Sequence, residues 1–193
     1  MELKIPVLLG TTRIGRQSLK VARFIVHELE RYDGLQTEFL DLANYDFPIM
    51  EQRLDHTDTP PPGLHEFSGK LVDADGLLIV APEYKNGYPG ALKNALDYLD
   101  PGVLRRKPVG IATVSAGGFG GLNCLAQLRL VCLALGGIPM SEKFPVSKVQ
   151  EAFDDQGVPR DPTLKEKLRP LLDELLWYTE AVVRHRRVTN QDS

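Results

Sequence analysis

Segments with the apolar spacing of strands alternate along this chain with segments that have the spacing of helices, and this alternation constrains the fold more than any other feature. The strand-like segments are residues 5–9, 37–42, 77–80, 109–114 and a short stretch within 138–146. The helical segments are residues 17–32, 64–74, 89–99, 122–135 and a last one that begins after Asp161. Strands that alternate with helices in this way form a parallel sheet covered on both faces.

The sequence therefore predicts an α/β fold of three layers, with a five-stranded parallel sheet between two layers of helices. Right-handed crossovers and short connections leave few topologies, and we favour the flavodoxin-like strand order 2-1-3-4-5. We expect one domain over residues 1–187 and a frayed tail over 188–193, because no internal repeat is visible and the last residues are polar.

Glycine, proline and aspartate mark the expected helix ends. Gly34 is the expected stop of the first long helix, and Gly136 with Gly137 ends the helix over residues 122–135. Asp161 is expected to cap the last helix, with a proline at its first helical position. Pro170 should kink or restart that helix, because proline cannot donate to the carbonyl four residues earlier.

Composition narrows the classes of function. The chain has 193 residues, 42% of them hydrophobic, and a formal net charge of −3, so it can bury a core but offers no strong charge for nucleic acid or an anionic membrane surface. Cys124 and Cys132 would lie about 12 Å apart along one helix, beyond the roughly 7 Å that a disulfide spans between α-carbons. Because no secretion signal and no run of ~18 apolar residues is visible, we expect a cytoplasmic protein with free thiols.

Three loops of unusual composition follow the first, third and fourth expected strands. All three should lie at the carboxyl edge of the sheet, where open α/β sheets bind ligands. The first, residues 10–18, offers hydroxyls, two guanidiniums and the amides of a helix N-terminus, a set that suits a phosphate monoester. It lacks the lysine of a Walker A loop and the glycines of the dinucleotide fingerprint. The residues expected to hold the phosphate are Thr11, Arg13, Gln17 and Ser18.

The other two loops suit a flat ligand. After residues 77–80, tyrosines can stack on a ring and polar groups can bond to its edge; the residues expected to line the ring are Pro82, Glu83, Tyr84, Lys85 and Asn86. In residues 115–121, glycines permit a close approach of the backbone to a flat ligand; the residues expected against it are Ser115, Ala116, Gly117 and Gly118.

Each loop alone has a simpler explanation. Hydroxyl residues are common caps at helix starts, glycines are common in turns, and tyrosines often lie at the rim of a core. Together, the three loops favour a mononucleotide whose phosphate lies at the first loop and whose flat ring lies between the other two. FMN is the natural candidate.

Three motifs of the chain, within residues 3–150, resemble those of the NADPH-dependent FMN reductase family. Residues 10–18 are similar to the phosphate loop of the family. Residues 82–84 with 88–97 are similar to its signature flavin loop and the helix that follows, and residues 115–121 to its second flavin loop. The chain departs from the family pattern at Lys85, where asparagine is common, and at Leu122 and Asn123, where arginine is frequent.

The resemblance implies an enzyme with no catalytic side chain. Hydride would pass from NADPH or NADH to N5 of FMN and then to a flavin, a quinone or a similar small acceptor. One open face of the flavin would serve both substrates in turn, which predicts ping-pong kinetics. The resemblance also implies a homodimer or a dimer of dimers.

Two other functions stay open at this point. A flavodoxin-type electron carrier would be far more acidic than this chain, and a non-redox interaction protein would not need a complete phosphate loop. The irregular, proline-rich segment over residues 44–63 is expected to cover the site. No metal is expected, and the histidines are expected at the surface because they lack metal-ligand spacing; they are His27, His56, His65 and His185.

Overall fold

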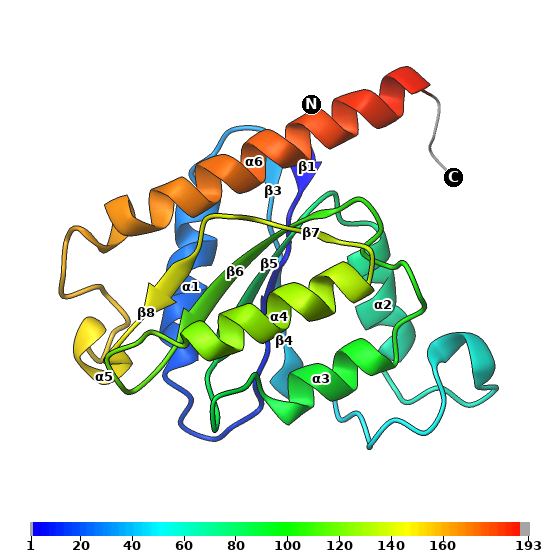
Figure 1. The fold of residues 1–193 in the computed structure, drawn as a ribbon, viewed down its shortest axis with the longest axis horizontal. Helices are drawn as coiled ribbons and strands as arrows, with labels where there is room; N and C mark the ends of the chain where they lie inside the picture. The colour runs from blue at the N-terminus through cyan, green and yellow to red at the C-terminus, as the bar shows by residue number, and fades with distance from the viewer. Residues whose placement is uncertain (1, 190–193) are drawn as a thin grey trace.

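The computed structural model describes residues 2–189 and has one main parallel sheet between two layers of helices (Figure 1). The strands are β1 (Leu3–Lys4), β2 (Val7–Leu9), β3 (Leu35–Gln36), β4 (Phe39–Asp41), β5 (Leu77–Pro82), β6 (Pro108–Val114), β7 (Ile138–Pro139) and β8 (Phe144–Val146). The helices are α1 (Ser18–Leu29), α2 (Leu64–Val72), α3 (Gly90–Asp97), α4 (Leu122–Ala134), α5 (Val149–Ala152) and α6 (Leu164–Thr189), with short 3-10 turns η1 (Leu42–Asn44) and η2 (Leu54–His56).

The strand order confirms the predicted fold class, although the strand count differs. The main sheet runs β4-β2-β5-β6-β7, and β8 pairs with the carboxyl half of β6. All of these pairs are parallel. The order is therefore 2-1-3-4-5 with its fifth place divided between β7 and β8.

The first two predicted strands are shorter than expected: residues 5–9 contain only β2 and residues 37–42 only β4, and the short strands β1 and β3 precede them. Pro6 has no N–H to give to a strand ladder, and it separates β1, which pairs with β3, from β2, which pairs with β4. On the neighbouring strand the Thr37 hydroxyl donates to the carbonyl of Ile5 at 2.9 Å. The parallel pair of β1 and β3 thus extends the pair of β2 and β4 past the amino ends of these strands.

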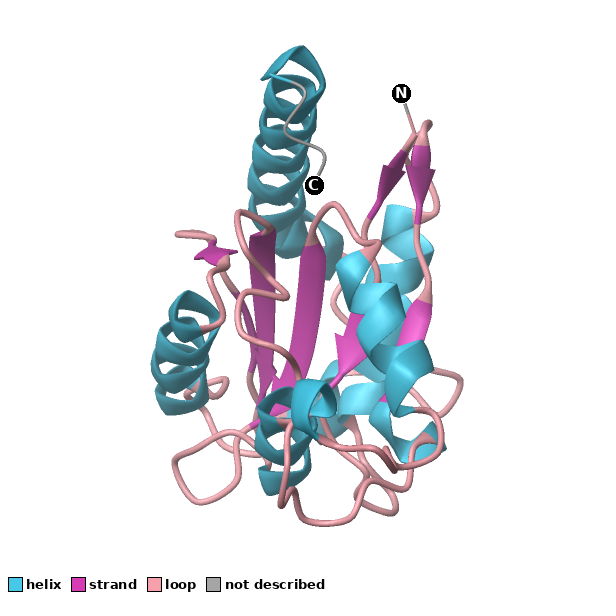
Figure 2. Ribbon diagram, turned by 90° about the vertical axis from the view of Figure 1, so that its right-hand side faces the viewer, coloured by secondary structure: helices cyan, strands magenta, loops and turns pink. Residues whose placement is uncertain are grey.

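Alternate residues of the strands supply two cores, one on each face of the sheet. Figure 2 shows helices on both sides of the strands. On one face, strand residues such as Val7 and Val80 lie in one buried cluster with α1 and α6. On the other face, Leu8 and Ile79 belong to a cluster with α2, α3 and α4. Both layers hold the carboxyl ends of the strands at one rigid edge.

Two helix ends differ in how well the sequence predicted them. α4 ends as expected: Gly136 has a φ of +82°, and the amide of Gly137 donates to the carbonyl of Cys132 at 2.8 Å, as in a Schellman motif. The expectation for Gly34 is wrong, because α1 already ends at Leu29 with Glu30 as its C-cap. Gly34, with a φ of +75°, instead lies in the turn that leads into β3.

The last helix begins later than predicted and extends further. α6 starts at Leu164, so Pro162 is not its first residue and lies in the turn before it. The Asp161 carboxylate accepts from the amide of Thr163 at 2.9 Å within that turn. α6 then runs without interruption through Pro170, so the helix is not restarted there. Pro170 is exposed, so water can satisfy the carbonyl that it leaves without a donor, while the apolar face stays packed. α6 also includes the first two residues of the expected frayed tail, and residues 190–193 lie outside the described part of the chain.

Both cysteines are free and buried on α4, as the spacing predicted. Within residues 2–189, no helix combines the length and the apolar character that crossing a membrane requires.

Candidate functional site

Three loops leave the carboxyl ends of adjacent strands: loop 1 (residues 10–17, after β2), loop 2 (residues 83–89, after β5) and loop 3 (residues 115–121, after β6). Loop 1 starts against α3, the helix that follows loop 2. A Cβ at Gly10 would lie 2.7 Å from a methyl carbon of Leu92 on α3, closer than real contacts allow. A larger residue at position 10 would therefore force the Leu92 side chain or loop 1 to shift.

Loops 1 and 2 are joined through Tyr84. Its hydroxyl lies 2.9 Å from the hydroxyl of Thr11, which is 1% exposed. The guanidinium carbon of Arg13 lies 5.8 Å from the centre of the Tyr84 ring, within the range of a cation–π contact. Three of the residues singled out from the sequence thus meet at one point, although Thr11 and Tyr84 are 73 positions apart in the chain.

Loop 1 carries buried polar groups around the start of α1. Arg16 forms an ion pair with Asp41, the last residue of β4. The Nε of Arg16 and the hydroxyl of Ser18 are buried, and neither has a hydrogen-bond partner within residues 2–189. The Gln17 amide donates only weakly, to the carbonyl of Gly15 at 3.3 Å. A buried donor without an acceptor destabilises a protein by about 1–3 kcal/mol, so these groups favour an incoming acceptor.

Loop 2 is a tight turn. Tyr84 and Gly87 exchange two backbone hydrogen bonds of 2.8 and 3.1 Å, and the two residues between them, Lys85 and Asn86, have φ values of +51° and +65°. Positive φ at both central positions is the signature of a type I′ turn. Both side chains are exposed. The carbonyl of Asn86 accepts from the Gln127 amide on α4 at 2.7 Å, which ties the turn to the neighbouring helix.

The Glu83 carboxylate caps α4. Gly121 precedes that helix and has no side chain to cap it. Instead, Oε2 of Glu83 accepts from the amides of Asn123 and Cys124, both at 3.0 Å. Loop 2 is thereby joined to the helix that follows loop 3, and the carboxylate is occupied, so Glu83 offers a ligand mainly its backbone. Pro82 is likewise buried, as the last residue of β5.

Loop 3 presents backbone to the outside. Gly117 and Gly118 are exposed, and a Cβ at either would meet no protein atom within 4 Å. The loop is held from below, because the Ser115 hydroxyl donates to the carbonyl of Gly117 at 3.0 Å and the amide of Lys148 donates to the same carbonyl at 2.9 Å. This arrangement leaves open space over a fixed stretch of backbone.

Residues 3–151 match the NADPH-dependent FMN reductase family. This chain belongs to that family. It is 29% identical over 174 residues to an NADPH azoreductase of Bacillus sp., covering 90% of this chain and 89% of the relative. It is 32% identical over 192 residues to a 2-hydroxy-1,4-benzoquinone reductase of Burkholderia sp., covering 97% and 100%. An oxidoreductase structure from Corynebacterium diphtheriae shares the fold, with a TM-score of 0.75, 17% identity and coverage of 93% and 98%.

The side chains of this FMN reductase suit the cofactor that the family binds. The unpartnered Nε of Arg16 and hydroxyl of Ser18 are donors that phosphate oxygens can satisfy. The open space over Gly117 and Gly118 is the kind of surface that a flat ring can cover. Loop 1 thus provides charged and polar side chains, and loop 3 provides a flat stretch of exposed backbone.

The segment over residues 44–63 is fixed to α3 in this reductase. The side-chain amide of Asn94 accepts from the amide of Met50 at 2.8 Å and donates to the carbonyl of Pro48 at 2.7 Å. The Tyr98 hydroxyl donates to the same Pro48 carbonyl at 3.1 Å. A pocket of about 340 Å³ lies between the start of this segment, α3 and Thr12 of loop 1.

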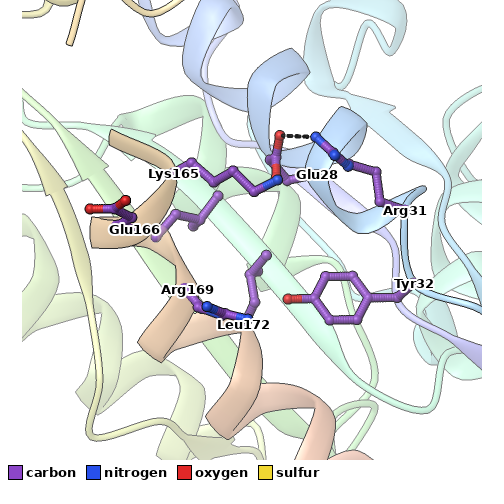
Figure 3. Close-up of a pocket in the computed structure, with 8 residues that line it drawn as sticks. Glu28, Arg31, Tyr32, Lys165, Glu166, Arg169 and Leu172 are labelled. Atoms are coloured by element: carbon purple, nitrogen blue, oxygen red, sulfur yellow. Dashed lines mark hydrogen bonds and ion pairs between the residues drawn. The ribbon is translucent and has the colours of Figure 1, made fainter. Parts of the chain in front are cut away.

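A second pocket lies away from the three loops. It is about 360 Å³ in volume and separates the end of α1 from the start of α6 (Figure 3). Its charged residues include Glu28, which forms ion pairs with Arg31 and Lys165 at 3.4 and 3.0 Å. None of its lining residues belongs to loop 1, 2 or 3, so this pocket is separate from the edge that the three loops form.

The histidines and Cys124 supply neither a metal site nor a nucleophile in the described part of the chain. All four histidines are exposed, as expected. In the described residues, no group of three or more His, Cys, Asp or Glu is arranged to hold a metal. Burial raises the pKa of the Cys124 thiol to about 12, and the Glu83 carboxylate adds to this shift. The thiol is therefore not a nucleophile near neutral pH.

Sequence reasoning missed several residues that shape this edge. Arg16 stood in the predicted phosphate loop without a role, and its partner Asp41 is 25 positions away. Asn94 and Gln127 looked like ordinary helix residues, and only their contacts reveal that they hold loops. Asp41 was the one with a signal, since a charged residue at the carboxyl end of a buried strand faces the ligand edge.

Proposed function

We propose that this FMN-dependent NAD(P)H oxidoreductase reduces a quinone or a similar small planar acceptor, and that donor and acceptor use one site in turn. The observation that carries the proposal is that loop 2 is bonded on both sides. Tyr84 connects loop 2 to loop 1, and Glu83 connects loop 2 to the start of α4, the helix that follows loop 3. The names of the two relatives, an azoreductase and a benzoquinone reductase, support the acceptor class.

The residues have distinct roles in this proposal. FMN, when bound, supplies the N5 atom that accepts and releases hydride. The side chains of loop 1 hold its phosphate, and the proposed contacts are Thr11, Arg13, Gln17 and Ser18. The backbone of loop 2 lies along the ring, with Tyr84 beside it; the proposed contacts are Pro82, Glu83, Tyr84, Lys85 and Asn86. The exposed backbone of loop 3 lies at the pyrimidine side; the proposed contacts are Ser115, Ala116, Gly117 and Gly118.

Steady-state kinetics test the proposal. The purified protein, saturated with FMN, is assayed with NADPH and with 1,4-benzoquinone at several fixed concentrations of each. Because one site serves both substrates in turn, double-reciprocal plots should give parallel lines. Intersecting lines would show that both substrates bind together. A protein that binds FMN but does not oxidise NADPH would be an electron carrier instead.

We also propose a homodimer that forms through α4. The outer face of this helix is apolar: Leu122, Leu130 and Leu133 are 43%, 68% and 57% exposed. The one charged residue of α4, Arg129, donates to the carbonyls of Met140 and Ser141, at 2.9 and 2.6 Å. A helix face with apolar side chains and no free charge suits a copy of itself, because an isologous contact places the same patch on both sides.

Sedimentation measurements with matched variants test the dimer. Leu130→Lys should shift the protein to monomers. Val158→Lys should not, because Val158 is 57% exposed but lies outside α4. A wild-type protein that sediments as a monomer would refute the dimer, and a tetramer would point to a dimer of dimers.

A cytoplasmic location and a single domain over residues 1–187 complete the proposal. The two free, buried cysteines are consistent with a reducing compartment. The mild net charge of −3 gives no reason to expect a nucleic-acid or membrane partner.

A further inference from the structure

Loop 1 holds a second arginine to which neither the motif nor the family resemblance gives a role. We infer that Arg16, positioned by Asp41, is the guanidinium that neutralises the phosphate of FMN. Arg13 instead lies at the surface beside Tyr84 and contributes less to phosphate binding. This inference rests on the proposed FMN site and adds to it one phosphate-binding residue and one positioning residue.

Arg16 is held in place, whereas Arg13 is exposed. The Arg16 side chain is 15% exposed, and that of its partner Asp41 is 9% exposed. The second carboxylate oxygen of Asp41 accepts from the amide of Ala43 at 3.0 Å, so the carboxylate is fixed at both oxygens. A fixed carboxylate restricts the plane of the guanidinium that it binds.

Donors without acceptors concentrate around this arginine. Three buried side-chain atoms of the described residues lack a hydrogen-bond partner, and two of them are Nε of Arg16 and the hydroxyl of Ser18. These residues stand two positions apart at the start of α1. Asp41 is the one acceptor that the Arg16 guanidinium has within residues 2–189. An anion with several oxygens, such as a phosphate, can satisfy both groups at once.

The local charge also matches a phosphate monoester. Arg13 and Arg16 against Asp41 leave one net positive charge, to which the N-terminus of α1 adds about half a charge. A phosphate monoester carries about −1.5 to −2 near neutral pH. Binding of the phosphate therefore brings this corner of the site close to neutrality, and it would not do so if Arg16 were absent.

Arg13 has a different environment. Its guanidinium carbon lies 5.8 Å from the centre of the Tyr84 ring, and its backbone amide donates to the Thr11 hydroxyl at 3.3 Å. A cation held over an aromatic ring at the surface is screened by water. We therefore expect Arg13 to contribute less to phosphate affinity than Arg16 does.

Flavin binding separates these roles, because riboflavin has the ring of FMN without its phosphate. The main variant is the double substitution Arg16→Met and Asp41→Asn, since Arg16→Met alone would leave a buried carboxylate without a partner. Fluorescence titration should show FMN affinity lowered about 10- to 100-fold, the loss expected for charge-assisted hydrogen bonds, with riboflavin affinity unchanged. The matched variant Arg13→Met should lower FMN affinity by a smaller factor.

Several results would overturn the inference. Equal losses for FMN and riboflavin would mean that the pair only supports the loop. A larger loss of FMN affinity in Arg13→Met than in the double variant would give the phosphate to Arg13. If wild-type protein binds neither flavin, the proposed function itself fails, which is a separate outcome.

Two single substitutions test the positioning role of Asp41. Asp41→Asn should weaken FMN binding by less than the double variant does, because Arg16 keeps its charge but loses the carboxylate that positions it. Arg16→Lys, with Asp41 kept, should bind FMN more tightly than the double variant and more weakly than wild type, because lysine keeps the positive charge. Tighter FMN binding in Asp41→Asn would show that the carboxylate competes with the phosphate instead of positioning Arg16.

Discussion

Loop 1 and loop 3 flank the same ligand edge and are built in opposite ways. Loop 1 concentrates polar side chains below the surface, including the unpartnered hydroxyl of Ser18 and the paired guanidinium of Arg16. Loop 3 exposes the backbone of Gly117 and Gly118, with no protein atom within 4 Å of where their side chains would be. One end of the edge thus offers charge and hydrogen-bond donors, and the other offers open backbone.

Loop 2 lies between loop 1 and loop 3 and is bonded toward both. The hydroxyl of Tyr84 reaches loop 1, and the carboxylate of Glu83 reaches the helix that follows loop 3. Two adjacent residues thus point in opposite directions along the edge. Substitutions that cut one connection at a time should reveal how far each loop depends on the other.

The largest effect is expected from Gly120→Ala, within loop 3. Gly120 has a φ of +64°, and a Cβ there would lie 2.6 Å from the Cβ of Pro145. A left-handed conformation and an overpacked contact together should lower the free energy of unfolding by about 2–4 kcal/mol. Urea unfolding measures the loss.

Gly118→Ala is the matched control from the same loop. Its Cβ would meet no protein atom, so the free energy of unfolding should stay within about 0.5 kcal/mol of wild type. FMN affinity should nevertheless fall, because the new methyl group occupies the space proposed for the ring. Equal unfolding midpoints for the two alanine variants would contradict the description of loop 3 as fixed below and open above.

Glu83→Ala should have the next largest effect. It removes the acceptor of two amides at the N-terminus of α4 and a negative charge at the positive end of that helix. Together these should lower the free energy of unfolding by about 2 kcal/mol. Glu83→Gln keeps an acceptor without the charge and should lose about half as much. If Glu83→Ala costs no more than Glu166→Gln, an exposed site on α6, then Glu83 is not a cap.

The outcome at Glu83 also shows what sequence reasoning can and cannot reach. Strand order followed from local patterns, because the apolar run over residues 77–80 and the polar loop after it are adjacent in the chain. The role of the Glu83 carboxylate depends on amides 40 and 41 positions away, and nothing local distinguishes a cap of another helix from a ligand contact. The same limit applies to Arg16 and Asp41, whose pairing exists only once two strands lie side by side.

Local signals also failed where competing interactions decided the outcome. Pro170 is a helix breaker by itself, yet the apolar face of α6 and the exposure of the proline let the helix continue. The expected second strand, over residues 37–42, is shortened to β4, because Pro6 on the neighbouring strand gives the ladder no donor. Both outcomes depend on contacts between elements that are far apart in the sequence, so the sequence of one segment alone could not predict them.

Tyr84→Phe cuts the other connection of loop 2. The variant loses the 2.9 Å hydrogen bond to Thr11 and leaves that buried hydroxyl with only the longer 3.3 Å bond from the amide of Arg13. The free energy of unfolding should fall by about 1 kcal/mol, and FMN should bind several-fold more weakly because loop 1 is less well held. Thr11→Val in the Tyr84→Phe background should cause little further loss. A full additional loss would show that the two hydroxyls act independently.

The smallest effect, and the sharpest test of loop 2 itself, is expected from Lys85→Asn. Lys85 adopts a φ of +51° at the first central position of the turn, a conformation that asparagine tolerates better than lysine does. The substitution should therefore raise the free energy of unfolding by about 0.5 kcal/mol. Lys85→Ala removes the side chain without easing the backbone, so it should leave stability unchanged. Because the Lys85 side chain is exposed, FMN affinity should be the same in both variants if loop 2 meets the ring through its backbone. Equal losses of FMN affinity in both would instead show that the lysine side chain itself contacts the flavin.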